Sequence, residues 1–345
     1  MQSRRIIHVV GCHAGGEIGD VIVGGVAPPP GDTLWEQSRY LARDTRLKDF
    51  LLNEPRGGVF RHVNLLVPPR NPQAHMGNII LEPETVPPMS GSNTICVTTV
   101  LLETGIIEMA EPETRLLLEM PGGLVAVTAE CRAGRVTAVR FANLPSFPAS
   151  LDAALEVPGL GTLTVDIAFG GDSFVIADAT TLGFRLVPEE APRLREAGMA
   201  IARAAEAQLG FRHPTLDGMN GITFCLLRGP VNTADDGIPV SRHAVTIRPG
   251  KLDRSPTGTG VSARLAVMHA RSEIGLHAPM RFESILGSCF EGRLLSETTV
   301  GDHPAVIPEV SGRAWITETR QLLLADDDPW PTGYRVADTW PLSDD

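Results

Sequence analysis

The feature that most constrains this chain is a faint internal repeat. Two strand-like apolar runs, residues 8–25 and 165–179, are each interrupted by two glycines and an acid, at 15–17 and 170–172. A repeat of this length indicates that one structural unit occurs twice along the chain.

An amphipathic helix pattern follows each interrupted run. The first starts near Thr33, where "TLWE" fits a capping box with Glu36 reaching back to the helix start. The second covers residues 189–210, is rich in alanine and ends at Gly210.

Each half then reaches a hydroxyl residue followed by glycine, in "MSGSNT" (89–94) and "SPTGTG" (255–260). Apolar helix patterns follow and are predicted to stop at Gly105 and Gly275; the first, rich in Thr and Val, is ambiguous between helix and strand. Further strand patterns come next. Corresponding features are separated by 155 to 167 residues.

This repeat predicts an α/β (α+β) protein of two similar, pseudo-symmetric domains. We expect domains at 1–150 and 151–345, with a linker-like segment at 143–159 and the active site in a cleft between them. The terminal segment is a candidate to cross back to the first domain.

Composition limits the partners. The 345 residues are 43% hydrophobic and 21% charged, which is typical of a soluble globular protein. A net charge of -11 argues against nucleic acid as a partner. No run of 18 apolar residues predicts a membrane span, and the start lacks the apolar core of a signal peptide. Five scattered cysteines without a CxxC indicate reduced thiols and a cytoplasmic location.

Two helix starts of this kind can bind one anion. The first amides of a helix are unpaired and carry partial positive charge, and glycine lets a ligand approach the backbone closely. We predict that a substrate carboxylate is held by the amides of Gly91, Ser92, Gly258 and Thr259.

The side chains just before these amides would then flank the carbon that bears the carboxylate. Ser90 and Thr257 are therefore the candidates for removing an α-proton, and Asp253 is placed to pair with a substrate amine. A single Ser-Gly or Thr-Gly at a helix start is most often an ordinary cap. Their paired occurrence within a repeat favours a functional role.

Other patterns carry less weight. "GTGVSA" (258–263) fits a dinucleotide-binding pattern only formally, because Pro256 and a loop separate it from the preceding strand. The histidines form no HExxH and no pair at metal-ligand spacing, so no metal site is predicted. His13 either lines the site or is structural, and Cys96 is expected in the core.

The sequence resembles the proline racemase superfamily, which includes 4-hydroxyproline 2-epimerases and trans-3-hydroxy-L-proline dehydratases. The motifs that carry the resemblance span nearly the whole chain: "HAGGE" (13–17), "NEPRG" (53–57), "MSGSNT", "PGGLV" (121–125), "NLPSF" (143–147), "DIAFGGDSF" (166–174) and "DRSPTGTG" (253–260). The resemblance implies a fold like that of diaminopimelate epimerase, no cofactor, a hydroxyproline-like substrate and a homodimer. It assigns carboxylate binding to the two helix starts and ring-nitrogen contact to Asp253.

The departures from the family are informative. Its racemases and epimerases carry cysteine at both positions occupied here by Ser90 and Thr257, and histidine at the position of Ser92. A free thiol has a pKa near 8.5 and an alcohol is a far weaker acid. Epimerisation needs a second group that returns a proton from the opposite face, whereas dehydration does not.

Threonine at position 257 resembles the trans-3-hydroxy-L-proline dehydratases of the family. We therefore predict such a dehydratase, a cofactor-independent carbon–oxygen lyase that forms Δ1-pyrroline-2-carboxylate. Ser90 is assigned as proton acceptor, helped by the helix dipole, a dry cleft or His13. The alternatives are a 4-hydroxyproline 2-epimerase, alone or as a second activity, and an imino-acid binding protein without catalysis.

Overall fold

A computed structural model describes residues 5–341 of the chain. Within this range the chain divides into two compact units, one of residues 5–141 with 312–341 and the other of Ala142–Ser311. The segment expected to be a linker near residue 150 instead forms strand β8 (Phe147–Val157) of the second unit. A run of four exposed residues at 149–152 interrupts the alternation of buried and exposed positions that would have marked this strand.

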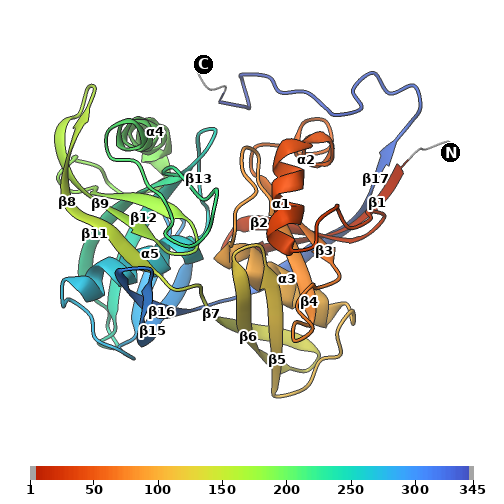
Figure 1. The fold of residues 1–345 in the computed structure, drawn as a ribbon, viewed down its shortest axis with the longest axis horizontal. Coiled ribbons are helices and arrows are strands. Elements are labelled where there is room, and N and C mark those ends of the chain that lie inside the picture. The colour runs from red at the N-terminus through yellow and green to blue at the C-terminus, as the bar shows by residue number, and fades with distance from the viewer. Residues whose placement is uncertain (1–4, 342–345) are drawn as a thin grey trace. The chain divides into compact units, whose positions relative to one another are not determined.

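The first unit combines strands with three helices (Figure 1). Its elements are β1 (Arg5–Ala14), β2 (Glu17–Gly24), α1 (Leu34–Arg43), α2 (Arg46–Leu52), β3 (Arg61–Val67), β4 (Met76–Leu81), α3 (Gly91–Glu103), β5 (Glu113–Met120), β6 (Gly123–Arg132), β7 (Arg135–Ala142) and β17 (Ala314–Leu324). β2 pairs with β3 and β4 with β5 in parallel, while β17–β1, β1–β2, β3–β4, β5–β6 and β6–β7 are antiparallel.

The second unit repeats this plan. Its elements are β8, β9 (Gly161–Phe169), β10 (Ser173–Asp178), a 3-10 turn (Pro188–Glu190), α4 (Ala191–Gln208), β11 (Phe224–Thr233), β12 (Pro239–Ile247), β13 (Lys251–Leu252), α5 (Gly258–Ala270), β14 (Met280–Glu283), β15 (Cys289–Val300) and β16 (His303–Gly312). β10 pairs with β11 and β12 with β14 in parallel, while β8–β9, β9–β10, β11–β12, β12–β13, β14–β15 and β15–β16 are antiparallel.

The two units therefore share one order of pairings. α3 connects the parallel pair β4 and β5, and α5 connects the parallel pair β12 and β14, as parallel neighbours require a crossover. β17 pairs with β1 as β8 pairs with β9. The predicted fold class, a mixed α/β protein with two pseudo-symmetric halves, is confirmed.

Helix ends mostly follow the sequence signals. The capping box between Thr33 and Glu36 is present, and Glu36 is the acidic residue in the first turn of α1. α5 is shorter than predicted: it ends at Ala270 rather than near Gly275, because Ser272 already adopts a left-handed φ of 59°.

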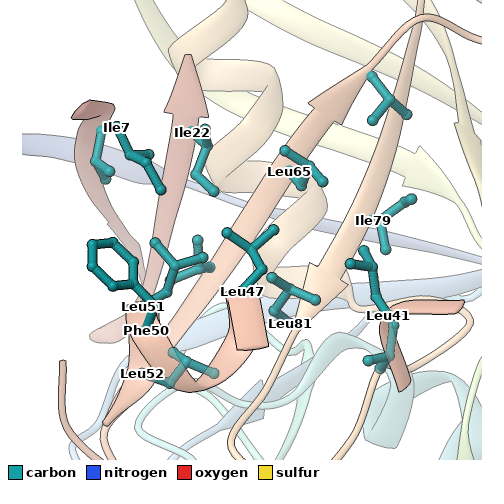
Figure 2. Close-up of a cluster of buried hydrophobic side chains, with 14 of the residues drawn as sticks. Ile7, Ile22, Leu41, Leu47, Phe50, Leu51, Leu52, Leu65, Ile79 and Leu81 are labelled. Carbon is teal, nitrogen blue, oxygen red and sulfur yellow. The ribbon is translucent and has the colours of Figure 1, made fainter. Parts of the chain in front are cut away.

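The core of the first unit lies between its two outer helices and its strands. Side chains of α1 and α2, including Leu41, Phe50 and Leu51, pack on Leu65 of β3 and Ile79 of β4 (Figure 2). These five side chains are at most 4% exposed, so each stabilises the fold by about 1.5–3 kcal/mol relative to an exposed position. No helix within residues 5–341 is long and apolar enough to cross a membrane.

α3 and α5 are buried on nearly every side, so neither has the charged outer face of an amphipathic surface helix. α3 packs against β1, β2 and β17. Its buried Thr94, Thr98 and Thr99 hydroxyls donate to carbonyls one turn earlier, at 2.7, 2.8 and 2.9 Å. Threonine can therefore occupy a buried helix with its hydroxyl paired. The segment that was ambiguous from sequence is a helix.

Candidate active site

Ser90 lies at the start of α3 but does not cap it. Its backbone is extended (φ -147°, ψ 126°), and its side chain accepts no hydrogen bond from the first amides of the helix. The half-buried hydroxyl instead accepts a hydrogen bond from Asn93 Nδ2 at 2.9 Å. The ordinary-cap interpretation therefore does not hold at this position.

A chain of buried amides lies behind Ser90. Asn93 Oδ1 accepts from Asn64 Nδ2 at 2.7 Å, and Asn64 Oδ1 accepts from Asn78 Nδ2 at 3.1 Å. All three asparagines are fully buried. Such a network fixes the orientation of the Asn93 amide, because its oxygen is already occupied by a donor.

His62 adjoins this network between two carboxylates. Its Nε2 lies 3.5 Å from Glu17 Oε1, its Nδ1 lies 3.6 Å from Glu82 Oε1, and Asn93 Nδ2 approaches Nδ1 at 3.5 Å. His62 and both glutamates are at most 4% exposed. The acid of the first Gly-Gly motif, Glu17, is thus part of a buried cluster of ionisable side chains.

Thr257 lies at the start of α5 in a strained conformation. Its φ of 58° is left-handed, which costs a β-branched residue about 1–3 kcal/mol, and it too makes no cap hydrogen bond with its side chain. Its hydroxyl donates to Asp253 Oδ2 at 2.6 Å. The Ser255 amide donates to the other oxygen of Asp253 at 2.8 Å, and the Thr257 amide donates to Ser255 Oγ at 3.0 Å.

A buried histidine supports this turn. His243 Nε2 donates to the carbonyl of Pro256, the residue before Thr257. Complete burial, the largest cause, and the charge of Arg264 lower the pKa of His243 to about 3. The ring is therefore neutral near pH 7, with its proton on the nitrogen that faces Pro256.

The predicted anion-binding amides lie in the first turns of the two helices, where Gly91, Ser92, Gly258 and Thr259 are all buried. The second Gly-Gly motif packs on α5. A Cβ on Gly170 would lie 2.2 Å from the Thr259 carbonyl oxygen, so only glycine permits this approach.

His13, on β1, is held in place by residues of the neighbouring strand and of the following turn. Its ring stacks on Trp315, directly opposite on β17, at 5.3 Å between centroids, and its Nδ1 accepts from the Gly16 amide at 3.2 Å. Burial lowers the pKa of His13. Its predicted help to Ser90 stays a prediction.

The cysteines are free thiols, and Cys96 is buried in α3 as predicted. Burial raises the pKa of Cys96, which is opposite to what a reactive thiolate needs. Among residues 5–341, no group of three or more His, Cys, Asp or Glu side chains is arranged to hold a metal ion.

Sequence reasoning identified the residues at both helix starts but missed their supporting partners. Asn64, His62 and Asn78 come from β3 and β4, far from Ser90 in the sequence, and no local motif marks them. His243 was missed for the same reason.

The structure defines a class of proteins built from two α/β units that share one order of strand pairings, each with a buried helix that begins after a hydroxyl residue. A likeness of fold alone extends to a phenazine biosynthesis protein of the PhzF family from Bacillus anthracis, at 10% identity and a TM-score of 0.60 over 93% of this chain and all of that one. The family model of proline racemase matches residues 9–335. The chain belongs to the proline racemase family.

Two solved structures are similar over nearly their full length. A hydroxyproline epimerase from Agrobacterium vitis, with bound trans-4-hydroxy-L-proline, is 38% identical, with a TM-score of 0.93 over 99% of this chain and 97% of that one. A probable proline racemase from Agrobacterium radiobacter K84, with bound carbonate, is 39% identical, with a TM-score of 0.92 over 97% of this chain and 98% of that one.

Proposed function

We propose that this protein is a trans-3-hydroxy-L-proline dehydratase. The starts of α3 and α5 act on one substrate, with its carboxylate on the amides of Gly91, Ser92, Gly258 and Thr259. Ser90 and Thr257 then lie on opposite faces of the α-carbon. Loss of the α-proton and the 3-hydroxyl gives an enamine, which becomes Δ1-pyrroline-2-carboxylate. We further propose that the protein is a cytoplasmic homodimer.

The hydrogen bond from Thr257 to Asp253 is the observation that supports this proposal best. An epimerase needs an acid on the second face, and a threonine whose proton is held by a carboxylate at 2.6 Å is a poor acid. Elimination needs no proton to be returned to the α-carbon. The hydroxyl pair therefore suits dehydration better than epimerisation.

The second candidate is a 4-hydroxyproline 2-epimerase. The 38% identity to the Agrobacterium vitis hydroxyproline epimerase, over almost the whole of both chains, favours it. It requires one hydroxyl to act as an acid toward carbon.

Two assays of the purified protein separate these functions. Incubation with trans-3-hydroxy-L-proline, followed by reduction of the cyclic imine and detection of proline, tests the dehydratase. Incubation with trans-4-hydroxy-L-proline in heavy water, followed by polarimetry and mass spectrometry of the α-position, tests the epimerase. The double variant Ser90→Ala/Thr257→Val is the control for contaminating activity.

Imine that disappears in the double variant supports the dehydratase. A changing optical rotation without imine supports the epimerase and contradicts our proposal. Thermal stabilisation by hydroxyproline with neither product indicates a binding protein.

A further inference from the structure

The hydrogen bonds polarise the two site hydroxyls in opposite directions. Thr257 Oγ1 donates to a carboxylate at 2.6 Å, whereas Ser90 Oγ accepts from an amide nitrogen at 2.9 Å. A hydroxyl becomes a base only if something takes its proton, as a neighbouring general base does for a catalytic serine. The two residues are therefore not equivalent.

Thr257 has an acceptor for its proton. An ionised carboxylate can only accept hydrogen bonds, and Asp253 is oriented by the Ser255 amide on its other oxygen. The left-handed backbone of Thr257 belongs to the turn that carries this contact. Strain of this kind persists where the surrounding structure over-determines it, and it clusters at functional sites.

Ser90 is in the opposite situation. Its partner is the NH2 group of Asn93, and the amide oxygen that could have accepted a proton is occupied by Asn64 Nδ2. Within residues 5–341, Ser90 Oγ has no partner that accepts its proton. A donor directed at an oxygen stabilises its negative form and so makes it a weaker base.

We propose that Thr257, rather than Ser90, removes the α-proton, and that Asp253 receives the hydroxyl proton of Thr257; this inference rests on the proposed dehydratase function. As the α-carbon–hydrogen bond breaks, its proton moves to Thr257 Oγ1 and the hydroxyl proton moves to Asp253. The electron pair forms the carbon–carbon double bond and the bond to the 3-oxygen breaks.

Stereochemistry allows the same pair to complete the reaction. In trans-3-hydroxy-L-proline the carboxylate and the hydroxyl are on opposite faces, so the α-hydrogen and the 3-hydroxyl share one face. Once Asp253 has taken the hydroxyl proton, it no longer holds the new proton on Thr257 Oγ1. Thr257 can then give that proton to the departing oxygen while Asp253 returns one to Thr257. Water leaves, and both residues regain their starting protonation.

Single variants of each hydroxyl test this assignment. We expect Thr257→Val to lower kcat for imine formation at least about 100-fold, because positioned proton transfer contributes about 10²–10⁴-fold. Thr257→Ser retains the hydroxyl and keeps most of kcat. Ser90→Ala should lower kcat for imine formation less than about tenfold.

Asp253→Asn separates proton transfer from substrate binding. Loss of the acceptor lowers kcat and removes the acidic limb of the kcat–pH profile, whereas loss of a ring-nitrogen contact alone raises KM. The chain offers a matched control on its surface: the exposed Thr162 hydroxyl also donates to a carboxylate, that of Glu156, at 2.6 Å. Thr162→Val and Glu156→Gln should leave both constants unchanged.

A second reaction keeps this test independent of the leaving group. L-Proline has no hydroxyl to lose, so we would follow deuterium entering its α-position in heavy water. Deuteration that needs Thr257, without imine from hydroxyproline, would refute the dehydratase and support the base assignment.

Two results would overturn the inference. Imine formation that is abolished in Ser90→Ala and retained in Thr257→Val would restore Ser90 as the base while leaving the dehydratase intact. A wild-type protein that forms no imine and deuterates neither proline nor trans-4-hydroxy-L-proline takes no α-proton from these substrates, which would end both proposals.

Discussion

Gly170→Ala is the substitution whose effect follows most directly from the structure. An added Cβ would lie 2.2 Å from the Thr259 carbonyl oxygen and 2.3 Å from the Ala263 amide nitrogen, both backbone atoms of α5. A carbon–oxygen contact needs about 3.3 Å, so α5 and the Gly170 loop must separate by roughly 1 Å.

Overpacking of this kind costs about 1–3 kcal/mol, and the alanine recovers about 0.4–1 kcal/mol by restricting the unfolded chain. We expect a net loss on the order of 1–2 kcal/mol in the free energy of unfolding. A shift of about 1 Å at reacting groups can also cost roughly 100-fold in turnover.

Urea denaturation followed by circular dichroism measures the stability change, and imine formation measures turnover. Gly275→Ala is the matched control, because nothing lies within 4 Å of its added Cβ and its φ is not left-handed. The free energy of unfolding of that control should be unchanged or slightly higher than that of the wild type. If both variants unfold at the same urea concentration, the close approach of Gly170 to α5 is not a constraint and the reasoning fails.

Three further predictions concern the two helix starts. His243 has a pKa of about 3 in the folded protein against 6.5 in the unfolded chain. The unfolded state therefore binds the extra proton, and the free energy of unfolding falls as the pH drops through that window. In urea denaturations between pH 7 and pH 4, the free energy of unfolding of His243→Gln should depend less on pH than that of the wild type. Ser90→Cys/Thr257→Cys should gain epimerisation of trans-4-hydroxy-L-proline, measured by polarimetry, because two thiols can exchange protons on both faces of the α-carbon. An inactive double variant would contradict the argument from acidity. Gly19→Ala places a Cβ 2.7 Å from Asn93 Oδ1, so steady-state assays should show a lower kcat even though the helix start itself is unchanged.

The sequence predicted the elements that are marked by short-range patterns. The repeat, the capping box at Thr33 and the two hydroxyl-glycine starts all depend on residues within a few positions of one another. Ser90 and Thr257 could therefore be placed at helix starts before any coordinates were known. β8 was not recognised because Pro148, its small residues and a run of four exposed positions resemble a linker.

The partners of the site residues could not be predicted in the same way. Asn93 of α3 contacts Asn64 of β3 across 29 positions because the helix packs on the strand. His62 contacts Glu17 across 45 positions because β3 pairs with β2. The left-handed φ of Thr257 has no local signal either, since the residue type disfavours it. Contacts set by long-range packing and conformations that oppose intrinsic preference leave no pattern in a single sequence.

The pairing of β1 with β17 has a consequence for synthesis on the ribosome. Residues 5–14 bind residues 314–324, so the second unit is inserted within the first and is fully translated before β17 emerges. Because chains emerge at about 5–20 residues per second, the nascent first unit waits on the order of tens of seconds for its last strand. The unit translated second is thus the one that can finish folding first, and the outer edge of β1 stays open to other strands until then.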